Sequence, residues 1–104
     1  MELARVVGNV VSTIKTQRLK GFKLMLLNIL EPDGKPTNSY VVAVDTVGSG
    51  VDEVVLAVRG SSARQVDELA NVPTDTSIVA IVDTVELGGK ITYRKDEKQK
   101  DAAT

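Results

Sequence analysis

Apolar and polar residues follow one another in short stretches along this chain, with turn-forming residues between them. In the first stretch every second residue is small or apolar, which is the period of a strand with one buried face. Several short strands separated by turn signals are typical of a small barrel or sandwich. The pattern predicts five main strands and a shorter last one, over Leu3–Thr13, Phe22–Leu30, Ser39–Val44, Val54–Val58, Ile78–Val85 and Lys90–Arg94.

Glycine and proline divide these stretches. Pro32-Asp33-Gly34 predicts a turn after the second strand, because proline presets φ and Asp-Gly tolerates the turn conformation. Gly88-Gly89 is a two-residue hairpin signal before the last strand. Gly8, in the middle of the first strand, indicates a bend or a close approach of another backbone.

One segment has a helical pattern. Ala63–Ala70 suits one or two helical turns, and Ser62 and Gln65 have the spacing of a capping box. Five main strands with a helix between the fourth and the fifth predict an all-β fold, a five-stranded OB-like β-barrel with one short helix. The usual OB-type barrel has its helix between the third and the fourth strands.

Two of the predicted strands are apolar almost throughout. Phe22–Leu30 and Ile78–Val85 lack the alternation of a strand with one face in water, and such strands are usually covered on both faces. A small domain has little material for a second cover, so contacts between subunits could supply it. The alternative is that these strands expose a few apolar residues, which is normal.

Composition and charge argue against some classes of function. The chain has 104 residues, enough for one domain, with 13 basic and 14 acidic residues and a net charge of −1. A domain that depends on phosphate contacts normally has a basic excess. The three aromatic residues, Phe22, Tyr40 and Tyr93, provide few stacking surfaces for bases. We therefore expect no nucleic-acid partner.

The chain contains neither cysteine nor histidine. Disulfides, the ordinary zinc sites and the Ser–His and Cys–His nucleophile pairs are excluded within one chain. No stretch approaches the roughly 20 apolar residues that cross a bilayer. We expect no metal, no cofactor and no membrane contact, and a cytoplasmic protein is the default interpretation.

A repeated sequence suggests one kind of catalysis. Val44-Asp45-Thr46-Val47 recurs as Val82-Asp83-Thr84-Val85, and two Asp-Thr elements resemble the paired carboxylates of an acid protease. That chemistry requires a glycine where valine stands here. The alternative, which we favour, is an aspartate at each strand end that accepts local backbone hydrogen bonds.

Two glycine-containing loops are further candidates for a site. Gly48-Ser49-Gly50 lacks the lysine of a phosphate-binding loop, so it indicates a tight turn against another backbone. Gly60-Ser61-Ser62-Ala63-Arg64 places backbone N–H groups, hydroxyls and a cation at a helix start, where an anion can bind. The alternative for the second loop is a helix cap with a surface arginine.

Several of these stretches resemble, in order, the EutN/CcmL family of bacterial microcompartment vertex proteins. The resemblance covers roughly residues 1–94 and rests on Leu3–Gly8, Val10–Thr13, Gly21–Leu24, Val42–Leu56, Gly60–Arg64 and Ile81–Asp83. Ser49 stands where the family often has alanine, and Asp52 where it often has glycine. Lys95–Thr104 matches no family motif, and its charged and small residues predict a flexible tail on a domain of residues 1–94.

The resemblance implies a barrel assembled as a cyclic homopentamer, with hexameric shell proteins as its partners in a microcompartment shell and with no enzymatic activity. It points to two loops as lining the pore or contacting a neighbour, and the candidate residues are Gly48, Ser49, Gly50, Glu53, Gly60, Ser61, Ser62 and Arg64. We expect Ser61 and Ser62 to form an anion-friendly pore rim. We also expect Asp45 or Glu53 to pair with Arg59 or Arg64, either within a subunit or across the ring interface.

Three other classes of function remain open on the sequence. An OB-fold module that binds single-stranded nucleic acid would share the fold but would need a basic groove and aromatic residues. An enzyme would need Asp45 and Asp83 close together. A generic adaptor would have no affinity for hexameric shell proteins.

Overall fold

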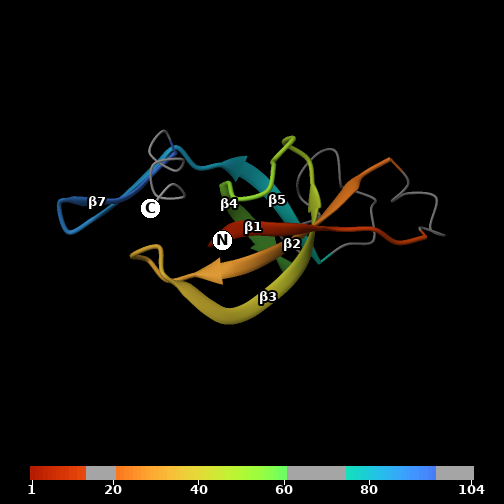
Figure 1. Cartoon of the computed structure of the whole chain (residues 1–104), viewed down its shortest axis with the longest axis horizontal. Helices are drawn as coiled ribbons and strands as arrows, with labels where there is room; N and C mark the ends of the chain where they lie inside the picture. The colour runs from red at the N-terminus through yellow and green to blue at the C-terminus, as the bar shows by residue number, and fades with distance from the viewer. Residues whose placement is uncertain (14–20, 61–74, 96–104) are drawn as a thin grey trace.

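The computed structural model describes residues 1–13, 21–60 and 75–95. Five strands close into a barrel in the order β1-β2-β3-β5-β4, so the predicted five-stranded barrel is confirmed (Figure 1). All neighbouring pairs are antiparallel except β3 and β5, which run parallel over two residue pairs. The barrel strands are β1 (Glu2–Val10), β2 (Lys23–Leu30), β3 (Pro36–Asp45), β4 (Val54–Arg59) and β5 (Thr76–Ile81).

The inward-facing side chains of all five strands form the core. Met25 and Leu27 of β2 are the largest of them, and β1 and β4 contribute small residues that let the barrel close tightly. At about 25 cal/mol per Å² of buried apolar surface, this shared interior is the main stabilising contribution. The core consists of Ala4, Val6, Met25, Leu27, Ala43, Val55, Ala57 and Ile78.

Gly8 marks a β-bulge. The register between β1 and β2 shifts between Val6, which faces Leu27, and Gly8, which faces Leu26. An extra residue in one strand bends that strand and increases its twist. The prediction of a bend at Gly8 is therefore confirmed, and the bulge lets β1 pair with β2 along one side and with β4 along the other.

The predicted strand over Ile78–Val85 is wrong as one element. It is divided into β5, which ends at Ile81, and β6 (Thr84–Leu87), which pairs with β7 (Lys90–Arg94) in a separate two-stranded sheet. The division has a simple cause. The partner strand β4 begins at Val54, so the ladder ends there and the Val82 N–H donates to the Val54 carbonyl as its last hydrogen bond (2.8 Å).

The two strands β6 and β7, which we call the ribbon, extend away from the barrel at the end that holds the N-terminus (Figure 1). The predicted hairpin at Gly88-Gly89 is confirmed, and both glycines have positive φ (59° and 83°). Such a turn suits a hairpin because its twist matches that of the strands, and glycine adopts it without a steric cost.

Other strand limits differ by a few residues from the prediction. β1 ends at Val10 rather than Thr13, and β3 begins at Pro36 rather than Ser39. A proline is tolerated there because it is the first residue of its strand. The predicted helix over Ala63–Ala70 lies outside the described residues. Within the described residues no helix is long and apolar enough to span a membrane.

Candidate assembly surfaces

The loop between β3 and β4 (residues 46–53, the β3–β4 loop) is held by a buried aspartate. The Asp45 carboxylate accepts hydrogen bonds from the N–H groups of Val47 (3.1 Å) and Ser49 (3.0 Å). The Thr46 hydroxyl donates to the Ile78 carbonyl of β5 (2.8 Å). The local hydrogen-bonding role favoured for Asp45 is thus confirmed.

The negative charge of Asp45 stabilises the loop. A carboxylate that accepts backbone N–H groups stabilises a turn, and charge-assisted bonds of this kind are about twice as strong as neutral ones. Asp83, the second member of the Asp-Thr repeat, is exposed between β5 and β6. Among the described residues no group of three or more acidic side chains could hold a metal ion.

Ser49 and Gly50, two of the predicted site residues, belong to this loop, with Ser49 buried and Gly50 half-buried in the single chain. Ser49 is 1% exposed, and its hydroxyl has no hydrogen-bond partner. Gly50 donates its N–H to Glu53 Oε1 (2.6 Å), and the Glu53 N–H donates back to the Gly50 carbonyl (3.2 Å). The predicted residue Gly48 is exposed, with φ of 75°.

Asp52 lies at a position whose backbone conformation favours glycine. It is the one non-glycine residue with positive φ (76°) in the part of the chain that the structure describes. The left-handed region costs an ordinary L-residue about 1–2 kcal/mol, and aspartate tolerates it better than most. The Asp52 N–H donates to the Val6 carbonyl (2.6 Å), so the loop cannot relax without losing a bond to β1.

We expect Asp52→Gly to be at least as stable as the natural protein and Asp52→Ala to be about 1 kcal/mol less stable than Asp52→Gly. In the Ala variant the positive φ still costs about 1–2 kcal/mol of steric strain in the folded state. In the Gly variant this strain is absent, but the greater conformational entropy of the unfolded chain lowers the stability by up to about 1 kcal/mol. Denaturant midpoints at equal subunit concentration measure the difference. Equal midpoints for the two variants would contradict the strain.

Glu53 also contacts the ribbon. Lys95, just after β7, places its ammonium 3.1 Å from Glu53 Oε2, and the hydrogen bond and charge of Glu53 raise the pKa of Lys95 above its usual value. Because that pKa is raised, the contribution is present at neutral pH and is lost only above the ordinary range of lysine. This pair escaped the sequence analysis, which assigned Lys95 to a solvated tail.

The predicted pairing of Arg59 with Asp45 or Glu53 is wrong within the chain. Arg59 forms a two-point ion pair with Glu2, with Nε–Oε1 and Nη2–Oε2 distances of 3.0 Å each. The strand register explains it, because β1 and β4 are antiparallel neighbours that bring Glu2 opposite Ala57. Gly60 donates its N–H to the Asp75 carbonyl (2.7 Å). The predicted site residues Ser61, Ser62 and Arg64 lie outside the described residues.

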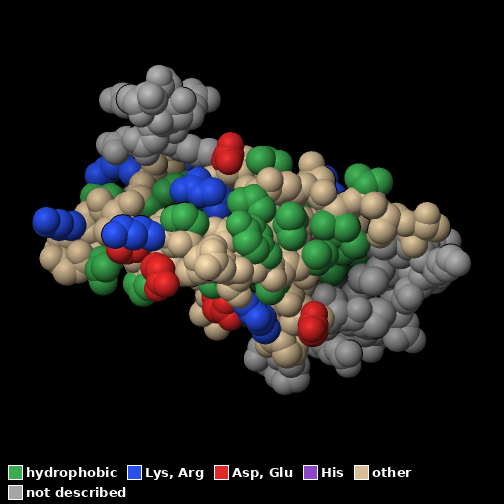
Figure 2. All heavy atoms as spheres, turned by 60° about the horizontal axis from the view of Figure 1, so that its bottom comes forward, with side chains coloured by type: hydrophobic (Ala, Val, Ile, Leu, Met, Phe, Trp, Pro, Cys, Tyr) green, Lys and Arg blue, Asp and Glu red, His purple; other side chains and the backbone are tan. Residues whose placement is uncertain are grey.

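The outer face of β1, β2 and β3 is apolar, and we call it the β1–β3 face. Figure 2, which turns this side of the barrel forward, shows hydrophobic side chains gathered at its centre. The strand registers join Val42 to Leu26 and Leu26 to Gly8, next to Val7. The face comprises Val7, Leu24, Leu26, Tyr40 and Val42, of which the last two and Val7 are exposed and the leucines are half-buried.

This face matches the apolar character that the sequence analysis found in the second strand. Met25 and Leu27 of β2 face the core, whereas Leu24 and Leu26 face outward with incomplete cover. Contiguous exposed apolar surface of this kind marks an interaction site in soluble proteins. The described part of the chain therefore leaves this side of the barrel available for a partner.

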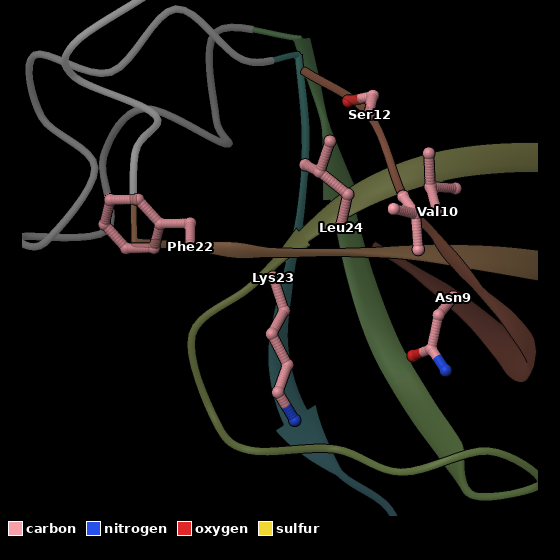
Figure 3. A pocket seen from close by; sticks show the side chains of 7 residues that line it. Asn9, Val10, Ser12, Phe22, Lys23 and Leu24 are labelled. Carbon is pink, nitrogen blue, oxygen red and sulfur yellow. The ribbon is translucent and has the colours of Figure 1, made fainter. Parts of the chain in front are cut away.

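A shallow pocket of about 490 Å³ adjoins this face, where the end of β1 meets the start of β2 (Figure 3). Val10, Leu24 and Ser12 extend to one side of the two strands, and Lys23 and Asn9 extend to the other. Four of its seven lining residues are apolar, namely Val10, Val11, Phe22 and Leu24, and Lys23 is its one charged residue. Ser12 and Lys23, the one hydroxyl and the one amine of the lining, extend to opposite sides of the strands, so the lining does not place a base beside a nucleophile.

Comparison with known proteins places these features among shell proteins. The family model described as "Ethanolamine utilisation protein EutN/carboxysome" matches residues 1–83. The chain is 45% identical over 95 residues to the carboxysome shell vertex protein CcmL of Synechocystis, covering 91% of this chain and 95% of that one. It is 39% identical over 95 residues to the shell vertex protein EutN of Escherichia coli K12, covering 91% and 100%.

Solved structures agree with the fold. CcmL of Gloeobacter violaceus superposes with a TM-score of 0.87 at 42% identity, covering 92% of this chain and 99% of that one. The GrpN pentameric microcompartment shell protein of Rhodospirillum rubrum superposes with a TM-score of 0.75 at 44% identity, covering 84% and 98%.

Proposed function

The chain belongs to the EutN/CcmL family of microcompartment shell vertex proteins, and from this premise we propose that it assembles as a cyclic pentamer that caps the vertices of a bacterial microcompartment in the cytoplasm. The observation that carries the proposal is identity of about 40% across nearly the whole chain with vertex proteins of two kinds of compartment. A relative of the same fold is described as a pentamer.

The role is geometric. A flat sheet of hexagonal tiles cannot close into a polyhedron without fivefold positions, so we propose hexameric shell proteins as the partners at the rim of the ring. A cyclic ring requires two unlike surfaces on each subunit, because each subunit contacts one neighbour on each side. We propose the β1–β3 face as one of the two ring contacts.

The β3–β4 loop is the second candidate for a ring contact. The residues Gly48, Ser49, Gly50 and Glu53 were predicted to lie near the pore or a neighbour, and the exposed Val51 beside them provides an apolar point of contact. Its backbone bonds to Asp45 and to β1 give the loop a defined shape before a partner binds. A preorganised loop loses less entropy on binding than a free one.

We propose a structural role without catalysis. Asp45, the more plausible acid of the Asp-Thr repeat, uses its carboxylate to accept two backbone N–H groups. A general acid or base would need that carboxylate near a substrate proton, at about 2.6–3.2 Å. The retention of enzymes within a shell requires no reactive group in this chain.

The shell-forming domain ends, in this proposal, at Lys95 rather than at Arg94. Lys95 donates its N–H to the Asp83 carbonyl (2.9 Å), which continues the pairing of β6 with β7 by one residue, and its ammonium pairs with Glu53 of the β3–β4 loop. Residues 96–104 form the proposed tail. We expect removal of residues 96–104 to leave the assembly unchanged.

The mass of the native assembly tests the function. We expect native mass spectrometry to give a particle of about five times the chain mass of 11.1 kDa, and mixing with hexameric shell proteins to give closed particles. A single-stranded oligonucleotide should not bind at physiological salt, as its binding would favour the OB-fold alternative. A stable monomer at micromolar concentration would contradict the pentamer.

A further inference from the structure

Two side chains join the β3–β4 loop to the ribbon: Arg5 of β1 contacts both, and Glu53 of the loop pairs with Lys95, the residue that follows β7. These two parts of the chain are separated in sequence by β4, β5 and the residues between them. The side chains of Glu53 and Arg5 take no part in the strand ladders that close the barrel, which are formed by backbone groups. Their contacts therefore call for a separate explanation.

Glu53 divides its two carboxylate oxygens between the two parts. Oε1 accepts the Gly50 N–H of the loop (2.6 Å), and Oε2 lies 3.1 Å from the Lys95 ammonium at the end of the ribbon. The Glu53 carbonyl also accepts the Val6 N–H (2.9 Å), so the backbone of Glu53 is hydrogen-bonded to β1. The side chain is only 19% exposed, so its pair with Lys95 is better protected from solvent than a typical surface ion pair.

Arg5 makes the equivalent pair of contacts from β1. Its Nη1 donates to the carbonyl of Asp52, the loop residue with positive φ (2.8 Å), and its guanidinium lies 5.7 Å from the centre of the Tyr93 ring in β7. A guanidinium within about 6 Å of a ring is attracted to its face. Loop and ribbon are therefore joined by two independent bridges.

The ribbon needs such bridges. An isolated two-stranded sheet is marginally stable in water, and the ribbon leaves the apolar residues Leu87 and Ile91 exposed. The loop holds a strained residue that would relax if its bonds were released. The ribbon and the loop would each be only marginally stable alone. A side chain that binds both therefore links the stability of one to that of the other.

We propose that Arg5 and Glu53 make the β3–β4 loop and the β6–β7 ribbon one cooperative unit, so that release of the ribbon also releases the loop. Energetic coupling of this kind is reciprocal, and ordering of the loop by a partner steadies the ribbon to the same extent. In the ring, and resting on the proposed function, a neighbour that binds the loop would also set the position of the ribbon.

The variant Lys95→Met tests the coupling, because Lys95 contacts the loop only through Glu53 among the bonds described above. It removes the ammonium and keeps the N–H that donates to Asp83. We measure hydrogen–deuterium exchange on the full-length assembly, with fragments that separate residues 46–53 from residues 84–94. We expect exchange to become roughly threefold faster or more in both segments, the size that a modest ion pair supplies.

Lys90→Met is the matched control, because it removes an exposed lysine from the same ribbon beside its turn. It should leave the exchange of residues 46–53 unchanged. Glu53→Gln, which retains an acceptor for Gly50 but loses the charge, should reproduce the effect of Lys95→Met in both segments. Arg5→Met should do so through the second bridge.

Faster exchange in the ribbon alone would overturn the proposal, as would no change in either segment. Faster exchange across β2 as well would mean general destabilisation and would also overturn it. The mass of the assembly is recorded for each variant. A five-chain particle with uncoupled loop and ribbon contradicts the coupling alone, whereas a monomeric natural protein contradicts the proposed function.

Discussion

Val42→Asp is expected to convert the pentamer into folded single subunits. Val42 lies on the β3 side of the β1–β3 face, paired across the strands with Leu26, and it is 46% exposed in the single chain. Its replacement does not disturb the core, because its side chain is on the outer side of the barrel. In a ring, however, every contact would bury one uncompensated carboxylate.

The expected effect is large. An uncompensated charge buried in an interface costs roughly 3–5 kcal/mol, so each contact would be weakened by more than about 100-fold. Native mass spectrometry and light scattering should then find single chains at concentrations where the natural protein is pentameric. Far-ultraviolet circular dichroism should be unchanged.

Val51→Asp is the matched control, since Val51 is also a valine and is also 46% exposed, but it lies in the β3–β4 loop. The two variants separate the two candidate ring contacts. If Val51→Asp dissociates the ring and Val42→Asp does not, the assignment of the ring contact to the β1–β3 face is wrong and the loop is the contact. If both dissociate it, each is one of the two unlike surfaces that a ring needs.

Asn28→Ala is expected to lower the free energy of unfolding by about 1–3 kcal/mol. Asn28 lies on β2 and is 3% exposed, and its Nδ2 donates to the carbonyls of Thr37 (2.8 Å) and Ser39 (3.2 Å) on β3. The register between the strands shifts at this point, so the regular ladder does not satisfy those groups. Ser39 is exposed and Thr37 is half-buried, so the cost is that of about one buried group without its partner, about 1–3 kcal/mol.

Asn38→Ala is the control for this prediction. Asn38 is an exposed asparagine in the same irregular stretch of β3, and surface substitutions of this kind usually change stability by less than about 0.5 kcal/mol. Denaturant unfolding at one subunit concentration should separate the two variants, because assembly adds to apparent stability. Similar midpoints for both would show that Asn28 does not replace the missing ladder bonds.

The role of Asn28 could not be predicted from the sequence. The second strand was recognised from its run of apolar residues, and the asparagine within that run gave no sign of its role. A strand pattern reports which residues are buried but not which backbone groups lack a ladder partner. The bulge that creates the need for Asn28 depends on how β2 and β3 align, and the irregular register became apparent only in the structure.

The predicted strand over Ile78–Val85 is a second case in which the sequence did not reveal how the strands pair. The run Ile78–Val85 has strand propensity throughout, and propensity cannot tell one strand from two that change partners. The change of partner at Val82 follows from the length of β4, which is a property of a different part of the chain. Hydrogen bonds to distant strands overrode the local pattern.

By itself, the sequence determined the five-stranded barrel, an irregularity at Gly8, the Gly88-Gly89 hairpin and the family. Strand periodicity, turn chemistry and ordered motifs are local properties of the chain. The absence of cysteine and histidine likewise excluded whole classes of chemistry before any fold was known. Only the tertiary structure decided the partners of Arg5, Glu53 and Arg59. Arg5 and Asp52 are 47 residues apart in sequence, and Arg59 and Glu2 are 57 apart. Closure of the barrel brings such residues together, and no periodicity of the chain encodes which charges will meet.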